Sequence, residues 1–511
     1  MVFPVVGGTQ DTSYEIENSL RTGGGDNHHL SMVYSSSASD ANRRKFTFSG
    51  WIKLGQAAHF TEYYDDEKYL LTSTDAAVST TNIGYGGYTS GNAGGFHLQD
   101  GRSGTYIETT SKFRDPSAWY HLVVRYDSTQ STASDRIFIY VNGVSQGLNY
   151  SNTGDPEVDL NTEVDFFLAG NNVDATSASS GNFVHNVNSY YNSGFDTINN
   201  SFDGYFADMY LINAQSLAPT EFGETNNNGV WVPKKYTGTF NSHSFHLEFK
   251  QTGSSANSSG IGADTSGQDN HFKVGVNSTL AAVDITTDTP TNNFATLNPL
   301  NIRLGKGITF SEGNTQIQTG TTGGTVGGFS TIAGLKSGKW YAEFKPTVVG
   351  TNATMRFGIE DTDFNAADGL CNVAASAYAS NGNKGRNATD TSHGDSYDDD
   401  DIIGVAVDLD NGAIYFSKNG TWQNSSDPES GSSKTGAAYT DILTILPTGG
   451  YMFAFNFVYN NSQQENVQAN FGNPCNTISS GNADGNGYGN FEYAVPSGYY
   501  SLCTKNLAEF G

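Results

Sequence analysis

Short runs of alternating apolar and polar residues, each ended by Gly, Asn or Asp, constrain this chain more than any other feature. One run begins at Lys45, where Phe46 and Phe48 alternate with Thr47, and similar runs follow at 118–126, 136–141, 164–168 and 202–212. A period of two is that of a strand with one buried face, and we see no long run with the helical period. We therefore expect an all-β protein with less than about a tenth of its residues in helices.

The chain is long enough for two sandwich domains. It has 511 residues, with 60 Gly against 12 Pro and only 15% charged residues, a composition that suits short strands and tight turns. A second block rich in strands runs from about 339 to 502, and the polar stretch between the blocks suggests a connector. We predict two tandem antiparallel β-sandwich (jelly-roll) domains, with an N-terminal extended arm at 1–29, sandwiches at 30–250 and 301–511, and a connector at 251–300.

The clearest local signal is a hairpin at 404–416. Asn411-Gly412 can adopt the positive φ values that a tight turn needs, and the residues on both sides alternate. A second turn, at Lys418-Asn419-Gly420, follows one strand later.

Charge and composition exclude several classes of function. The net charge of −26 argues against nucleic acid, which is bound through Lys and Arg, and against anionic membranes. We find no apolar stretch for membrane insertion and no signal peptide, so we expect synthesis in a cytoplasm without export by that route. Cys371, Cys475 and Cys503 are widely spaced and odd in number, which predicts ordinary buried thiols.

Both sandwiches resemble known domain families. WYHLV (119–123), RIFIYVNG (136–143) and FDGYFAD (202–208) resemble the laminin-G/concanavalin-A-like jelly roll, over roughly residues 30–250. GKWYAEF (338–344), DIIGVAVD (401–408) and FSKNG (416–420) resemble the SPRY domain, over about 300–505. Sandwiches of these kinds serve in lectins, receptors and scaffolds, so the likeness alone leaves the function open.

The order of the domains adds a more specific resemblance. Together with VVGGTQD (5–11) near the start and DTPTNNFATLNPL (288–300) at the junction, it is similar to that of virion appendage proteins of tailed phages that infect marine bacteria. This resemblance implies a non-enzymatic virion structural protein: a fibre, a spike or a capsid or neck decoration. Its implied partners are other virion proteins and further copies of itself, in a homo-oligomer such as a trimer, and its implied location is the virion, assembled in the host cytoplasm. A host cell-surface glycan would be its external ligand.

Two other functions stay open: a free lectin-like carbohydrate-binding module and a glycan hydrolase of concanavalin-like fold. The hydrolase needs two carboxylates about 5–10 Å apart across a cleft. The Glu-x-Asp-x-x-Glu strand that supplies them in that fold is absent from the sequence, so we assign no catalytic residue.

Recognition is expected on loops at the ends of the sandwiches, where rings and amides can meet a ligand. The loops at 361–400 and 422–440 of the second domain supply Tyr397, Trp422 and Asn424 as candidate ligand-binding residues, and the insertion at 171–200 of the first supplies Tyr190 and Tyr191. Plain surface decoration or subunit contact is the alternative for these rings.

Acidic residues between 395 and 401 could bind Ca²⁺, the only cofactor that the sequence suggests. Asp395, Asp398 and Asp400 are the candidate ligands, although such a run is more often a solvated loop, and consecutive acids point in alternate directions.

The N-terminal arm carries isolated apolar anchors that would order against a partner: Phe3, Val5, Val6 and Tyr14. We therefore expect deletion of residues 1–25 to spare folding and to prevent assembly.

Overall fold

The computed structural model describes residues 14–23, 27–55, 67–75, 80–86, 94–100, 105–151, 158–170, 183–192, 197–303, 308–320, 324–349, 354–362, 375–459 and 464–511. It is mostly β structure, with 44% strand and 7% helix, as the alternation predicts. The described residues form two units that divide between Thr291 and Asn292. We call them the first and second domains.

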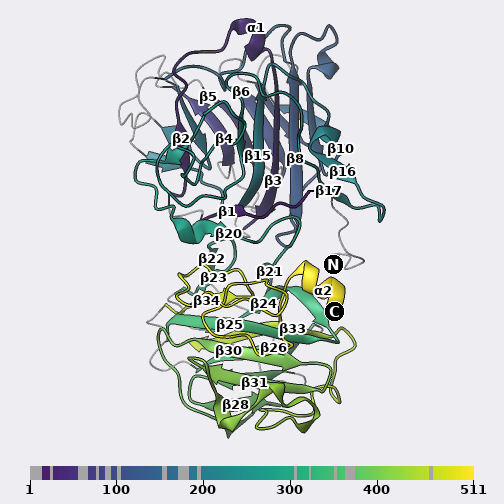
Figure 1. Ribbon diagram of the computed structural model, residues 1–511, viewed down its shortest axis with the longest axis vertical. Coiled ribbons are helices and arrows are strands. Elements are labelled where there is room, and N and C mark those ends of the chain that lie inside the picture. Colours follow the sequence, from purple (N-terminus) through teal and green to yellow (C-terminus); the bar gives the residue numbers. More distant parts are fainter. Residues whose placement is uncertain are drawn as a thin grey trace. The chain divides into compact units, whose positions relative to one another are not determined.

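Two antiparallel sheets form the first domain (Figure 1). Sheet A has the order β10 (Val144–Ser145), β9 (Ile137–Val141), β8 (Trp119–Asp127), β3 (Lys45–Leu54), β15 (Gly204–Asn213), β1 (Ser19–Thr22) and β20 (Ile285–Thr286), and β18 (Phe245–Leu247) also pairs with β15. Sheet B has the order β11 (Leu148–Ser151), β7 (Thr105–Thr109), β6 (Phe96–Asp100), β5 (Thr80–Tyr85), β4 (Lys68–Thr74), β12 (Val184–Val187), β2 (Leu30–Met32) and β19 (Lys273–Val274).

Shorter elements complete this domain. They are the hairpins β13 (Tyr190–Asn192) with β14 (Thr197–Asn199) and β16 (Gly223–Thr225) with β17 (Trp231–Pro233), the helix α1 (Asp40–Arg43), and the 3₁₀ turns η2 (Ala133–Asp135), η3 (Pro219–Glu221) and η4 (Ala282–Asp284).

Strand β3 shows how the alternation builds the first domain. Phe46, Phe48 and Ile52 face the core between the sheets. The alternate side chains, Ser49 and Lys53 among them, face outward, yet they are buried too. Sheet A is therefore covered on its outer face by other parts of the same domain.

Two further antiparallel sheets form the second domain (Figure 1). Sheet C has the order β21 (Leu297–Arg303), β24 (Gly324–Leu335), β33 (Tyr451–Tyr459), β26 (Thr354–Asp361), β27 (Ser376–Ala379), β28 (Asn383–Arg386) and β29 (Thr389–Ser392). Sheet D has the order β22 (Thr309–Ser311), β23 (Gln316–Gln318), β34 (Asn466–Asn470), β25 (Lys339–Val348), β30 (Ile403–Asp408), β31 (Ala413–Lys418) and β32 (Thr421–Trp422). The strand β35 (Tyr500–Ser501) adds to β25 in parallel, and η5 (Gln423–Ser425), η6 (Pro428–Ser433) and the helix α2 (Thr504–Phe510) complete the domain.

The hairpin at 404–416 is present as β30 and β31, with Asp408 paired to Ala413. Its turn is wider than a two-residue loop: Gly412 has a φ of 81°, and the Asp408 carboxylate accepts hydrogen bonds from the backbone N–H groups of Asp410 (3.0 Å) and Asn411 (2.8 Å). The next turn is the tighter one. Asn419 and Gly420, with φ of 49° and 77°, join β31 to β32 in the two-residue geometry that favours Asn-Gly.

Three expectations about the organisation of the chain are wrong. Residues 14–23 are not a free arm, because β1 pairs with both β15 and β20 inside sheet A. Most of 251–300 is not a loose connector, since β19 and β20 pair with β2 and β1 of the first domain. Residues 164–168 form a buried turn, in which Phe166 and Phe167 fill the core without strand pairing.

Candidate functional site

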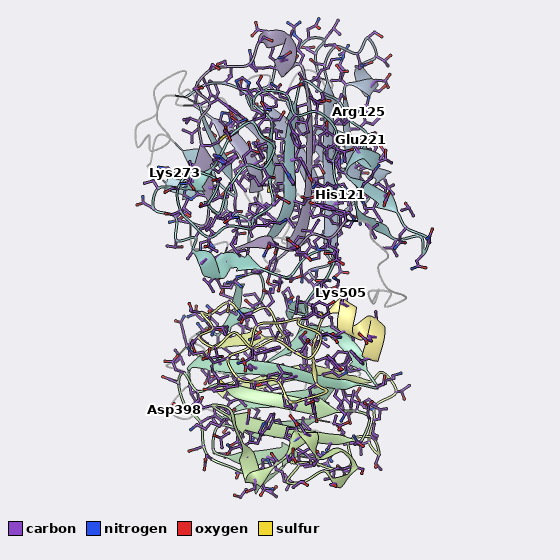
Figure 2. The ribbon with its side chains drawn as sticks, viewed as in Figure 1. His121, Arg125, Glu221, Lys273, Asp398 and Lys505 are labelled. Carbon is purple, nitrogen blue, oxygen red and sulfur yellow. The ribbon has the colours of Figure 1, made fainter. Side chains whose placement is uncertain are left out.

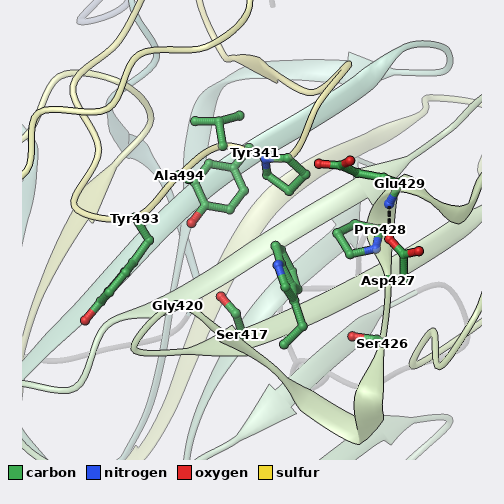
Figure 3. A pocket seen from close by; sticks show the side chains of 12 residues that line it. Tyr341, Ser417, Gly420, Ser426, Asp427, Pro428, Glu429, Tyr493 and Ala494 are labelled. Carbon is green, nitrogen blue, oxygen red and sulfur yellow. Dashed lines mark hydrogen bonds between the residues drawn. The ribbon is translucent and has the colours of Figure 1, made fainter.

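A pocket of about 490 Å³ lies on the outer face of sheet D. Tyr341 of β25, Ser417 of β31 and Trp422 of β32 contribute side chains from the sheet. Two segments from later in the chain form the walls, at 426–429 and 493–496. Figure 3 shows Tyr493 on one side of the pocket, with Asp427 and Glu429 on the other.

A buried carboxyl group, Glu343, holds the Tyr493 wall in place. It accepts hydrogen bonds from the backbone N–H groups of Tyr493 (2.9 Å) and Glu492 (3.0 Å), and from the Tyr341 hydroxyl (3.1 Å). Burial raises the pKa of Glu343 to about 7, against the pull of these donors. Glu343 thus couples the position of the wall to strand β25.

The tight turn after β31 positions the aromatic groups. A Cβ atom on Gly420 would lie 2.5 Å from the Tyr493 ring, so glycine is needed there both for its φ and for this close approach. Trp422 is half-buried and meets Tyr341 edge-to-face, with ring centroids 6.5 Å apart. Its indole N–H has no hydrogen-bond partner among the residues that the structure describes, so it is free to donate to a ligand.

Hydrogen bonds fix the position of the wall at 426–429, which we call the acidic wall because it carries Asp427 and Glu429. Asp427 caps η6 by accepting from the backbone N–H of Glu429 (2.9 Å), and Glu429 accepts from the backbone N–H of Ser497 (2.8 Å). Tyr499 donates to the carbonyl oxygen of Pro428 (3.0 Å). In these bonds each carboxylate uses one of its two oxygens.

Of the second-domain residues predicted to bind a ligand, Trp422 lines the pocket. Asn424 is exposed beside it at a φ of 57°, with its amide 3.3 Å from the Gly436 carbonyl oxygen, but it is not a lining residue. Tyr397 is not a surface platform, and that prediction is wrong: its side chain is 4% exposed, and its hydroxyl donates to the carbonyl oxygens of Met355 and Tyr378 inside the core. Part of the loop expected around it is strand, because 376–392 form β27, β28 and β29.

Other candidate residues lie in or near uncertain segments. Tyr190 and Tyr191 belong to β13, which pairs with β14, but their side chains lie outside the described part of the structure. Phe3, Val5 and Val6 lie outside it entirely. The prediction that Tyr14 becomes ordered only against a partner is wrong. Its ring packs against a buried cluster of its own domain, and its hydroxyl donates to the Asp208 carboxylate (3.0 Å).

Two acids of the run at 395–401 form ion pairs with lysines of the same domain. Asp400 pairs with Lys345 (3.0 Å), and Asp401 pairs with Lys418 (3.1 Å). Asp395 and Asp398 are exposed, and Figure 2 shows Asp398 at the surface of the second domain. Among the described residues no three His, Cys, Asp or Glu side chains are placed to hold a metal ion, so the calcium prediction has no support here.

Sequence reasoning did not name Tyr493, Asp427 or Glu429, although the expected recognition loop at 422–440 contains the two acids. Tyr493 comes from a segment much later in the chain that shows no strand periodicity. Within the loop, the Asp-Pro-Glu pattern of an N-cap followed by Pro is the local signal that could have singled out the two acids.

Comparison with known families identifies both sandwiches. Residues 24–191 match the model of the concanavalin A-like lectin/glucanases superfamily, and residues 339–473 match the SPRY domain. The chain therefore carries concanavalin-like and SPRY domains in tandem, which fits a binding role. No curated protein matches the chain, and no helix among the described residues is long and apolar enough to cross a membrane.

Three solved structures are similar to part of this chain. The human HERC1 SPRY domain is 18% identical, with a TM-score of 0.26, over 34% of this chain and 96% of its own. A Bacteroides ovatus protein provisionally described as carbohydrate-binding is 16% identical, with a TM-score of 0.25, over 40% of this chain and 46% of its own. A heptameric pentraxin from Limulus polyphemus is 14% identical, with a TM-score of 0.25, over 40% of this chain and 80% of its own.

Proposed function

We propose that this chain is a non-enzymatic attachment protein whose second domain binds a glycan in the pocket on sheet D. The observation that carries the proposal is a pocket that holds the half-buried Trp422 ring together with two carboxylates on one wall. Sugar rings present C–H faces that pack on aromatic rings, and their hydroxyl groups donate to carboxylates. The pocket volume is within the range of small-ligand sites.

Binding without cleavage is favoured by where the carboxylates lie. Asp427 and Glu429 are on the same side of the pocket (Figure 3), whereas a glycosidase places its two carboxylates on either side of the scissile bond. Each is also committed to a backbone N–H group by one oxygen. We therefore prefer recognition to hydrolysis for this site.

We further propose that the protein acts on the virion of a tailed phage, in contact with other virion proteins and with copies of itself. The support is the resemblance of the domain order and of the junction string at 288–300. Its location and copy number in purified particles test this part. Absence from the particle, with glycan binding retained, would favour a free lectin-like module.

The binding test compares the full-length protein with Trp422→Ala on immobilised host-surface glycans. Loss of the ring should weaken binding by about 1 kcal/mol, or roughly fivefold in Kd. Tyr140→Ala, which removes a half-buried ring from β9 of the first domain, is the matched control. Binding unchanged in Trp422→Ala would contradict the pocket, and released oligosaccharide would favour the hydrolase.

A further inference from the structure

The lining of the pocket on sheet D is acidic and aromatic, with no basic side chain among its described residues. Asp427 and Glu429 supply two negative charges, and Trp422, Tyr341 and Tyr493 supply rings. Such a lining can bind the hydroxyl groups and C–H faces of any sugar, but its two carboxylates have no basic side chain beside them in the lining. This combination of carboxylates and rings attracts a cation.

Three lysines close in the sequence to lining residues are held elsewhere. Lys339, two residues before Tyr341, pairs with Asp408 (3.0 Å). Lys418, two residues before Gly420, bonds to the Ser396 carbonyl oxygen (2.7 Å) and pairs with Asp401. Lys434, beyond η6, donates to the Thr440 carbonyl oxygen (2.6 Å). The two carboxylates of the wall are therefore not neutralised by these groups.

The wall that carries Tyr493 also lies near acidic side chains. The pKa of Tyr493 is raised by burial and then by the charges of Glu492, Glu343 and Asp401. The net charge of the chain, −26, also opposes an anionic ligand at long range.

We propose that the pocket selects glycans with a free, protonated amino group over neutral or anionic glycans. This inference rests on the proposed glycan-binding function and assigns its chemical class. The ammonium group would lie between the acidic wall of Asp427 and Glu429 and the rings of Trp422 and Tyr493. A carboxylate neutralises it on one side, and a ring face attracts it on the other.

The test measures binding of the full-length protein to oligosaccharides of one length and linkage in three forms: glucosamine, N-acetylglucosamine and a uronic acid. At a pH where the amine is protonated, we expect about tenfold tighter binding of the glucosamine form than of the acetylated form, and no binding of the uronic acid. The preference should shrink at high salt, because salt screens charge.

Glu429→Gln and Asp427→Asn should each remove most of the preference. Both variants keep the oxygen that accepts the backbone N–H, so the walls should keep their shape. Asp159→Asn, on an exposed residue of the first domain, changes the net charge equally and should leave the preference intact.

Each result decides between the claims. Equal binding of amine and acetylated forms overturns the amine preference and leaves glycan binding standing, whereas no binding of any form counts against the proposed function itself. A preference that survives in both pocket variants would assign it to net charge and overturn the pocket's role. Equal binding of tetralysine would reassign the site to cationic peptides.

Discussion

Each domain covers the outer face of one sheet with aromatic segments, and the two covers differ in how they hold a tryptophan. On sheet A, Trp231 stacks on His121 with ring centroids 6.0 Å apart, and its indole N–H donates to His121 (3.0 Å); Figure 2 labels His121 within the first domain. On sheet D, Trp422 faces a pocket, and its indole N–H is unpartnered among the described residues. The two half-buried tryptophans therefore differ in whether a residue of the same chain accepts the indole hydrogen bond.

Charge separates the two covers as well. The outer face of sheet A buries an ion pair, in which the Lys53 ammonium meets the Asp288 carboxylate at 2.6 Å with both side chains fully buried. Trp119 donates to the same carboxylate (3.2 Å). The cover of sheet A pairs its charges internally, whereas the pocket on sheet D exposes two carboxylates of like sign.

The largest expected effect is on the stability of the first domain, when the buried ion pair on the outer face of sheet A is broken. Asp288→Ala leaves the Lys53 ammonium buried without its carboxylate, and we expect a loss of about 3–5 kcal/mol in the stability of the first domain. Hydrogen exchange resolved by peptide should show faster exchange in β3 and β8 with no change in β25. Asp269→Ala, at an exposed residue of the same domain, is the control. A loss below about 1 kcal/mol would mean that the cover is not packed as described.

A second prediction distinguishes the two domains by how the stability of each depends on pH. Because the pKa of Glu343 is raised by burial from 4.5 to about 7, the folded second domain binds a proton more tightly than the unfolded chain between these values. Its stability should therefore fall as the pH rises from about 4.5 to about 7, by roughly 3 kcal/mol from this group. Glu343→Gln should remove this part of the pH dependence.

The first domain should respond in the opposite sense. Burial lowers the pKa of His121 to about 3 and that of His185 to about 4, so their contribution is present above pH 6.5 and is lost as the pH falls toward those values. His393, lowered to about 4, adds the same trend to the second domain but is unchanged in the Glu343→Gln variant. Parallel pH profiles for wild type and variant would contradict the assignment to Glu343. Glu509→Gln is the control.

The smallest expected effect is the difference in stability loss between Trp231→Ala and Trp422→Ala. A Cβ atom on Gly143 or Gly223 would lie 2.5 or 2.6 Å from the Trp231 ring, which shows how closely that ring is enclosed. Trp231→Ala should cost the first domain about 2 kcal/mol, while Trp422→Ala should cost the second less than about 1 kcal/mol and act mainly on binding. Denaturant unfolding of both variants measures this difference. Equal losses would remove the distinction between packing and recognition.

Local pattern predicted the long strands well, because their alternation reports one buried face. It failed at β1, where Arg21 is fully buried and pairs with Asp284 (3.3 Å) far along the chain. A short strand that buries a charged residue has no local signature. The polar composition of 251–300 likewise did not reveal that its two short strands, β19 and β20, pair with strands near the start of the first domain.

The candidate site was predictable only in part. Trp422 follows a readable Asn-Gly turn, so its place at the end of a strand could be inferred from the sequence. Tyr397 was misjudged because it was placed on a loop at the end of the sandwich, while its ring turns inward to stack on Phe357. The walls around Tyr493 and Glu429 depend on long-range packing, which one sequence does not reveal.

The first domain begins and ends at one place, since Thr291 donates to the carbonyl oxygen of Ile16 (2.8 Å) and β1 pairs with β20. A domain with adjacent ends can be inserted into a loop of another protein or circularly permuted without stretching its chain. Joining residues 14 and 291 through a short linker, and opening the chain at an exposed turn, should therefore preserve the sandwich. Because its two ends are adjacent, the first domain should also keep its fold when it is fused to other domains.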